Sequence, residues 1–182
     1  FKERVFQIIT EEKVDLVIPC RDDDIAVLGE LAEAHPELWP KAMCGPSSVG
    51  RAMDDKWNTY LFCKQHDLPV SESLIAGGAE TPQQFAERVG FPLIAKPRHG
   101  FSSRGIFLLE DIAQLERALA RPDYAVQEFL GDPETYWSFK RSIELDGMPL
   151  FYTLHGLKHE IQLMFTPRSE HVGTFATFNR QA

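Results

Sequence analysis

Residues 92–109 constrain the fold more than any other part of the chain. A short apolar segment, Pro92–Lys96, ends in a lysine, and a second apolar segment, Gly105–Leu109, follows after a loop. The loop between them is rich in glycine, serine and cationic side chains. Apolar segments of this length, bounded by glycine and proline, are typical of strands. The sequence therefore predicts two strands joined by a polar, cationic loop.

This loop has the chemistry that a bound polyphosphate requires. Gly100 and Gly105 allow the backbone to approach a ligand closely, because neither carries a side chain. Ser102 and Ser103 offer hydroxyl and amide donors, and Lys96 supplies a positive charge. The pattern is neither a Walker A loop nor a dinucleotide-binding fingerprint, since no Gly-Lys-Ser/Thr opens a helix and no G-x-G-x-x-G occurs. A flexible hairpin with solvated charges would give the same pattern.

The overall charge argues against two classes of ligand. The 182 residues carry a formal net charge of −8, with a sequence pI of about 5.2. An acidic chain is poorly suited to nucleic acid or to an anionic membrane surface, and no apolar run is long enough to span a bilayer. Cys20, Cys44 and Cys63 show neither disulfide nor zinc spacing, and His155 and His159 do not share a helical face. We therefore expect a cytoplasmic protein with reduced thiols and no metal ligands.

The N-terminal region predicts a βα arrangement. Val14–Pro19 is a short apolar run suited to a buried parallel strand, and an amphipathic helix follows it. Asp22–Asp24 lie between them, at the strand end where open α/β sheets bind ligands. Helix capping and solvation explain these aspartates equally well. A second short strand is expected at Ala42–Cys44, and Ser47 or Ser48 is placed to cap the next helix.

The rest of the chain predicts a mixed α+β region. Thr81-Pro82 with Gln84 is a strong helix start, because threonine caps, proline suits the first position and glutamine completes a capping box. Gly90 is expected to end that helix. Apolar and polar residues alternate over Tyr136–Leu145, which predicts a strand, and Asp146-Gly147 predicts a hairpin turn after it. The other expected elements are a helix at 111–120 and strands at 124–129, 150–152, 161–165 and 174–178.

Two further features suit a nucleotide. Lys56 begins a helix upstream of the loop and is a second cation able to reach a phosphate. Val126–Leu130 is an expected strand that runs into Gly131-Asp132-Pro133-Glu134. The backbone at such a strand end can hydrogen-bond an adenine edge, and a carboxylate can meet the ribose hydroxyls. Taken alone, Val126–Leu130 is also what a plain sheet strand looks like.

The order of these parts resembles the ATP-grasp superfamily. Within it, the chain is most similar to the large chain of carbamoyl phosphate synthase and to biotin carboxylase. The matching motifs lie between residues 14 and 134 and are Asp15–Pro19 with Asp23-Asp24, Cys44–Ser47, Asp55-Lys56, Pro92–Pro97, Ser102–Ile106, and Gln127–Gly131 with Glu134. Each motif is loose by itself, and their common order and spacing carry the resemblance.

The resemblance implies a fold and a set of binding residues. Residues 1–50 would be the end of a Rossmann-like α/β domain that precedes the ATP-grasp fold, and residues 51–182 would be an incomplete α+β ATP-grasp fold. ATP would lie between two lobes, with two lysines on its phosphates, a lid over them and a linker reading adenine. The residues implied for these roles are Lys56, Lys96, Ser102, Ser103, Gly105, Gln127, Glu128, Phe129, Leu130 and, for ribose, Glu134.

The resemblance also implies a reaction. A small-molecule carboxylate would attack ATP to give an acylphosphate, which an amine or another nucleophile would capture, with Mg²⁺ and lysines stabilising the phosphoryl charge. The chain departs from the family pattern in two places. Ser138 and Lys140 stand where the family often has an acid, and the Glu-x-Asn pair of magnesium ligands does not occur after Glu134. Mg²⁺ is therefore expected only in a full-length protein, and the catalytic residues stay unidentified.

Three functions are open at this point. The first is the ATP-binding region of an ATP-dependent carboxylate ligase, in an incomplete chain that would be inactive alone. The second is a non-catalytic nucleotide-binding or regulatory module that has lost its metal site. The third is an α/β interaction domain that binds no nucleotide. The expected partners are the carboxylate substrate and its nucleophilic acceptor, and the sequence leaves a homodimer open.

Overall fold

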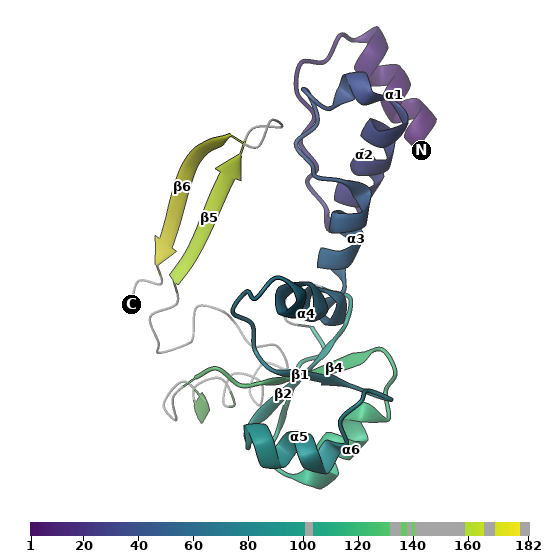
Figure 1. The fold of residues 1–182 in the computed structure, drawn as a ribbon. Coiled ribbons are helices and arrows are strands. Elements are labelled where there is room, and N and C mark those ends of the chain that lie inside the picture. The colour runs from purple at the N-terminus through teal and green to yellow at the C-terminus, as the bar shows by residue number, and fades with distance from the viewer. Residues whose placement is uncertain (101–103, 132–135, 138–139, 141–158, 166–169, 179–182) are drawn as a thin grey trace. The chain divides into compact units, whose positions relative to one another are not determined.

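The computed structural model describes residues 1–100, 104–131, 136, 137, 140, 159–165 and 170–178 (Figure 1). The chain divides into two compact units, residues 1–54 with 160–177 and residues 55–159 with 178–182. Each unit has its own cluster of buried apolar side chains. Among the described helices, none combines the length and the apolar character that crossing a membrane requires.

Helices form most of the first unit. They are α1 (Lys2–Glu11), α2 (Asp22–Ala34), the short 3-10 helix η1 (Pro36–Leu38) and α3 (Ser47–Asp54). Leu28, Leu31 and Ala32 lie on one face of α2 and are buried together with Ile9 and Leu38. The predicted aspartates 22–24 occupy the first turn of α2, where their negative charges interact favourably with the helix dipole. Helix stabilisation therefore accounts for their position.

The two strands predicted in this unit are reduced to one parallel bridge, between Val17 and Ala42. The prediction of a buried strand over Val14–Pro19 is wrong, because Leu16 and Ile18 are 48% and 58% exposed. A parallel strand is stable when both of its faces are covered. Among the described residues of this unit, Val17 and Ala42 form a single bridge, so no strand forms on either side of it.

A carboxylate, not a serine, caps α3. Ser47 is the first helical residue, and its amide and hydroxyl groups each donate to Glu33 at 2.8 Å. The two chain segments can approach this closely because Gly29 has no side chain. A Cβ atom on Gly29 would lie 2.8 Å from the amide nitrogen of Ser47 and 2.9 Å from the carbonyl oxygen of Gly45. The prediction of a serine cap is therefore wrong. Glu33 of α2 takes that role and connects α2 with α3.

A four-stranded antiparallel sheet organises the second unit. Its strands are β1 (Ser73–Ile75), β2 (Leu93–Pro97), β3 (Phe107–Leu109) and β4 (Tyr124–Glu128), in the order β1-β4-β2-β3. The predicted strand–loop–strand is confirmed, since β2 and β3 pair with Ile94 opposite Leu108. The strand predicted at 124–129 is β4, which pairs with β1 on one side and β2 on the other. With three residues, β1 is too short to show the alternation by which strands are predicted.

Three helices accompany this sheet, α4 (Lys56–Gln65), α5 (Pro82–Val89) and α6 (Ile112–Leu119). The predicted capping box of α5 is confirmed, because Thr81 and Gln84 each accept a hydrogen bond from the other's backbone amide, at 3.2 and 2.9 Å. The side chain of Asp111 caps α6 by accepting from the amide of Gln114 at 2.8 Å. Local sequence thus sets where both helices begin.

Helices α5 and α6 cover one face of the sheet, whereas α4 lies on the opposite side (Figure 1). Phe85 of α5 and Leu115 of α6 are fully buried against Leu93, Ala95 and Val126 of the sheet. Burying a side chain of that size stabilises a fold by about 1.5–3 kcal/mol. This core gives a rigid support to β2, which carries Lys96, and to β4, which carries Gln127 and Glu128.

The segment after β4 differs from the prediction of a strand over Tyr136–Leu145. Tyr136, Trp137 and Lys140 are helical. The hydroxyl of Tyr136 donates to Glu110, and the ammonium of Lys140 donates to both carboxylate oxygens of Glu110 at 2.8 and 2.9 Å. Residues four apart share one face of a helix, so these contacts favour a helical turn over the alternation.

The last described strands are β5 (His159–Phe165) and β6 (His171–Phe178), which pair as a two-stranded sheet. They confirm the strands predicted at 161–165 and 174–178. The predicted turn at 146–147 and the strand at 150–152 lie outside the described residues.

Candidate functional site

The two lysines predicted to contact phosphate lie close together in the second unit. Lys96 is near the end of β2, where the strand enters the loop, and Lys56 is the first residue of α4. Burial of the Lys96 side chain lowers its pKa, and the positive charge of Lys56 lowers that pKa further. Among the described residues, no carboxylate forms an ion pair with Lys96. Both causes disfavour the ammonium form, and a bound anion would oppose both.

A buried carboxylate, Asp55, links the start of α4 to the residues after β2. Its side chain is 4% exposed and accepts from the amide of Trp57 at 2.9 Å, which makes Asp55 the N-cap of α4. It also accepts from Nε of Arg98 at 3.1 Å and from the terminal Nη2 of the same guanidinium. Burial raises the pKa of Asp55, but the hydrogen bonds from Arg98 and Trp57 outweigh it and leave that pKa lowered. Asp55 is therefore held as a carboxylate.

Backbone carbonyls at the start of the loop hold Lys56 in place. The amide of Lys56 donates to the carbonyl of Arg98 at 3.0 Å, and its ammonium group donates to the carbonyls of Arg98 at 3.3 Å and Gly100 at 3.1 Å. Arg98 thus contacts both Asp55 and Lys56. One hydrogen-bonded group therefore connects α4, the end of β2 and the start of the loop.

Glycine is required where the loop returns to the sheet. Gly105 has a φ of +71°, in the left-handed region that favours glycine. A Cβ atom there would also lie 2.8 Å from the hydroxyl of Tyr124 and 3.1 Å from Cγ of Pro97. Both conformation and space exclude a larger residue. Ser102 and Ser103, the predicted donors of this loop, lie outside the described residues.

The residues predicted to read adenine begin inside a central strand. Gln127 is buried, its Nε2 donates to the hydroxyl of Ser73 at 2.8 Å, and it pairs with Ser73 in β1 and Ile94 in β2. The amide of Glu128 donates to the carbonyl of Glu72 at 2.9 Å. The side chain of Gln127 thus has a structural role, in addition to the role predicted for it.

The remaining predicted residues follow the end of β4. Leu130 is exposed, and the ring of Phe129 meets that of Tyr136 edge-on, with centroids 5.7 Å apart. Glu134, predicted to hold ribose, lies outside the described residues. The chain therefore leaves the sheet at the end of β4, and the apolar side chain of Leu130 is exposed there.

The register of the sheet separates the two halves of the predicted site. Lys96 pairs with Ala125 near the start of β4, whereas Glu128 at its end pairs with Leu93. The two positions are three residues apart along an antiparallel pair, which corresponds to about 10 Å. The lysines and the adenine-reading segment thus lie at opposite ends of the β2–β4 pair.

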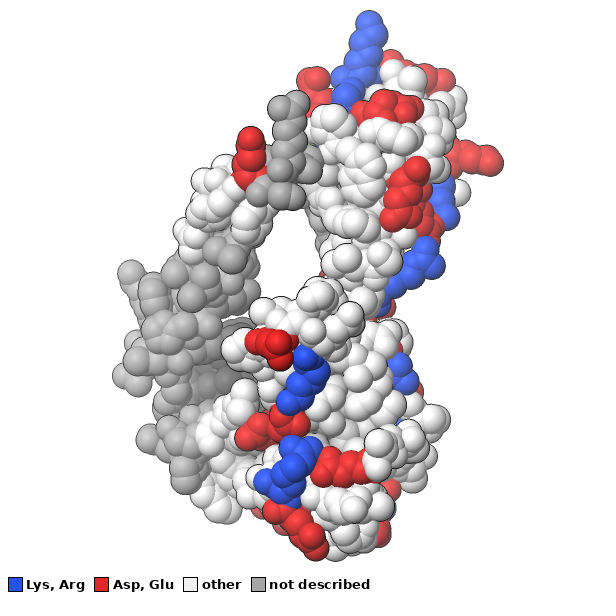
Figure 2. All heavy atoms as spheres, in the orientation of Figure 1, with Lys and Arg blue, Asp and Glu red and all other residues white. Residues whose placement is uncertain are grey.

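Ion pairs tie the surrounding elements together. Glu72, just before β1, binds Lys64 of α4 at 2.5 Å and Arg88 of α5 at 3.0 Å, and Arg88 also binds Glu80 at 2.8 Å. The hydrogen bond from Lys64 is the main cause that lowers the pKa of Glu72. Figure 2 shows that acidic and basic side chains are interspersed on the visible face. Partly exposed pairs of this kind each contribute at most about 1 kcal/mol, so they support the sheet without dominating its stability.

Within the described part of the chain, no group of three or more His, Cys, Asp or Glu side chains could hold a metal ion. Cys20, Cys44 and Cys63 are free thiols. The residues that the structure describes therefore do not fit a magnesium site.

The chain is similar to known proteins in both sequence and fold. The carbamoyl phosphate synthase large chain of Thermus thermophilus is 25% identical over 136 residues, which cover 70% of this chain and 13% of that protein. The formate-dependent phosphoribosylglycinamide formyltransferase of Erwinia tasmaniensis is 30% identical over 122 residues, covering 66% of this chain and 29% of that protein. A solved structure of biotin carboxylase from Campylobacter jejuni, in a β-γ-ATP complex, matches with a TM-score of 0.53 and 17% identity over 72% of this chain and 32% of that one. No family model matches the chain.

The chain is thus similar to ATP-grasp enzymes in both sequence and fold. The resemblance predicted from the motifs is thereby confirmed, as is a mixed fold with a small antiparallel sheet. The chain spans less than a third of the length of the relatives named above, so what the whole protein does is a separate question.

The sequence interpretation missed the connection between Asp55 and Arg98. Asp55 occurs in one of the quoted motifs, and Arg98 directly follows another, Pro92–Pro97. The two residues are 43 positions apart, and no local pattern indicates that they meet. The signal that was available is the aspartate directly before the helix that begins at Lys56, which is a favoured N-cap.

Proposed function

We propose that the chain is the ATP-binding region of an ATP-dependent carboxylate ligase. The observation that carries this proposal is the state of Lys96, a partly buried ammonium group with a second lysine beside it and no described carboxylate to pair with. Such an arrangement lowers the stability of the empty protein, because like charges repel and burial removes water. A polyphosphate placed against both lysines would reverse both effects.

The dimensions of the sheet support a nucleotide as the source of that phosphate. Lys96 and the end of β4 at Glu128 are about 10 Å apart along the strand pair, by the register described above. A nucleotide has its base at one end and its phosphates at the other, so an extended one would reach from the exposed Leu130 to Lys96. Gly100 and Gly105 would let the loop between β2 and β3 close over the phosphates.

Other residues enter the proposal through the resemblance. We assign phosphate contacts to Ser102 and Ser103, adenine contacts to residues 127–130 and ribose contacts to Glu134, while residues 1–50 would be the end of a Rossmann-like domain and 51–182 part of the ATP-grasp domain. The whole protein would act in the cytoplasm on a small carboxylate and a nucleophilic acceptor, as a monomer or a homodimer. Because the described residues do not fit Mg²⁺, we assign this chain nucleotide binding and derive no step through the metal.

Within this proposal, Asp55 and Arg98 hold Lys56 in position. Asp55 and Arg98 would hold the first turn of α4 against the loop, so that both ammonium groups face one phosphate chain before the ligand arrives. Pre-organised charges stabilise developing negative charge more strongly than charges that must first be arranged. We therefore treat Asp55 and Arg98 as positioning residues and the two lysines as the groups that bind.

Calorimetric titration of the 182-residue chain with ATP, ADP and a non-hydrolysable ATP analogue tests the proposal, with and without MgCl₂. Lys96→Ala should weaken ATP binding by about tenfold or more, as loss of a charged contact does. Lys13→Ala, which removes an exposed lysine from the first unit, is the matched control and should bind like the parent. Failure of every adenine nucleotide to bind the folded chain would refute the proposal, and unchanged affinity in Lys96→Ala would refute the role of that lysine.

A further inference from the structure

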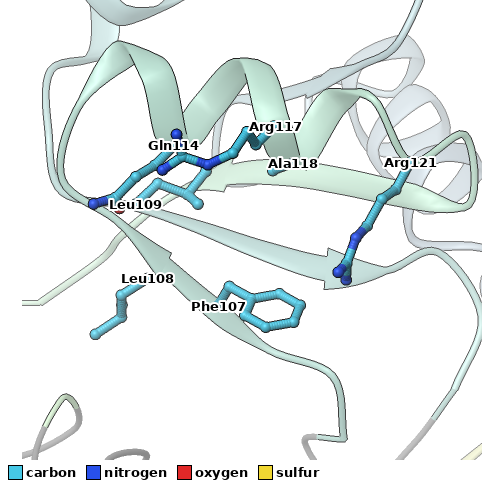
Figure 3. A pocket seen from close by; sticks show the side chains of 7 residues that line it. All are labelled: Phe107, Leu108, Leu109, Gln114, Arg117, Ala118 and Arg121. Atoms are coloured by element: carbon cyan, nitrogen blue, oxygen red, sulfur yellow. The ribbon is translucent and has the colours of Figure 1, made fainter.

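We propose that a second site, between β3 and α6, binds a small organic anion with an apolar body. A pocket of about 290 Å³ lies there (Figure 3). Its apolar part includes Phe107, Leu109 and Ala118, and its polar part consists of Gln114, Arg117 and Arg121. These residues differ from those proposed to bind the nucleotide, and β3 forms the edge of the sheet on the far side of β2 from β4.

The two charged residues that line this pocket, Arg117 and Arg121, are both positive, although the chain carries a net charge of −8. Arg117 and Arg121 form no ion pair with any residue that the structure describes. Other described arginines do pair with carboxylates, among them Arg4, Arg21, Arg51, Arg88 and Arg98. In a protein with an excess of acidic side chains, two unpaired guanidinium groups beside one pocket indicate an anionic ligand, since arginine binds carboxylate and phosphate through two parallel hydrogen bonds.

The aromatic surroundings hold Arg121 at the pocket. Its guanidinium lies over the ring of Phe107, at 4.9 Å from the centroid, and over the ring of Tyr124, at 5.1 Å. Figure 3 shows the side chain reaching from the end of α6 toward Phe107. Stacking on two rings restricts the arginine without neutralising it. A ligand therefore meets a cation that is already in position.

The apolar part and the volume define the ligand class. Phe107 is an exposed aromatic side chain on an edge strand, and a ligand that covered it would remove that apolar surface from water. Pockets for small molecules commonly measure roughly 300–1,000 Å³, and this one, at about 290 Å³, lies just below that range. It suits a compact acid, with an aromatic or branched body against Phe107 and Leu109 and its charge at the two arginines.

Titrations followed by amide chemical shifts test the proposal with four probes: phenylacetate, phenyl phosphate, inorganic phosphate and the neutral phenylacetamide. We expect saturable shifts in β3 and α6 with the two aromatic anions, and at least about tenfold weaker binding of phenylacetamide and of inorganic phosphate. The two aromatic anions distinguish a carboxylate ligand from a phosphate ester. Arg117→Gln with Arg121→Gln should reduce the affinity for the preferred anion by at least about tenfold, for the same reason.

Arg21→Gln is the matched control. Arg21 is an exposed arginine just before α2 in the first unit, where it pairs with Asp23. This variant should bind the anions like the parent. Arg117 is exposed on α6, so Arg117→Gln alone tests the site if the double variant does not fold. Equal binding of phenylacetamide and phenylacetate, unchanged affinity in the arginine variants, or shifts confined to residues outside β3 and α6 would overturn the proposal. None of these outcomes depends on whether the chain binds ATP.

Discussion

Removing the charge of Asp55 should destabilise the second unit strongly, because that charge is buried and paired. In Asp55→Asn, the amide oxygen can still accept from the amide of Trp57, since asparagine caps helices about as well as aspartate. What is lost is the charge that faces Arg98. Asp55→Ala loses both the charge and the cap, so the difference between the two variants isolates the capping bond.

The structure sets the size of each effect. Removing one partner of a fully buried ion pair destabilises a protein by about 3–5 kcal/mol. Arg98 is 27% exposed, so water can partly solvate the guanidinium that is left behind, and we expect about 1.5–3 kcal/mol for Asp55→Asn on this discount. Loss of the cap adds about 1 kcal/mol in Asp55→Ala.

Urea unfolding followed by the fluorescence of Trp57 measures these values. The chain has three tryptophans, so the variants are compared in a Trp39→Phe and Trp137→Phe background in which Trp57, in the first turn of α4, is the reporter. A single local reporter is needed because two units need not unfold together. Asp123→Asn, the same change at an exposed aspartate, should stay within about 0.5 kcal/mol of the background. If Asp55→Asn falls within the 0–1 kcal/mol or so of an exposed pair, the Asp55–Arg98 pair does not hold α4 in place.

Other perturbations test the neighbouring features. The pKa of Lys96 is lower in the folded chain than its ordinary 10.5, so between those two values the unfolded chain binds more protons and the free energy of unfolding should rise with pH. Lys96→Met should abolish that rise, raise the free energy of unfolding at neutral pH and weaken ATP binding. If the variant and the parent show the same pH profile of unfolding, the pKa of Lys96 is not shifted. Gly105→Ala should destabilise by more than the roughly 1–2 kcal/mol of a left-handed alanine, because its Cβ also meets Tyr124, whereas Gly77→Ala, with a φ of +70° and open space, should show only the conformational part in thermal unfolding. Thr81→Ala should destabilise by about 1 kcal/mol by removing the capping box of α5, measured by urea unfolding.

Elements with a local signal were predictable from the sequence. The capping box at Thr81, the cap at Asp111 and the strands on either side of the glycine loop each depend on residues a few positions apart. Elements that depend on distant partners were not. Val14–Pro19 has the composition of a buried strand, but a strand also needs neighbours, and this one has a single bridge. Tyr136 and Lys140 are helical because both reach Glu110, a contact that alternation of apolar residues does not reveal.

The candidate site shows the same limit in its electrostatics. The sequence contains many lysines, and the motifs single out Lys56 and Lys96, but nothing in the sequence distinguishes a solvated ammonium group from a desolvated one. That difference arises when β2 carries Lys96 into the fold and Asp55, through Arg98, holds the start of α4 beside it. A lysine such as Lys13 keeps its water and has no need of an anion. The phosphate affinity that we propose for this site would therefore come from a positive charge that the fold leaves partly desolvated and unpaired, whereas the motif identifies only the residue.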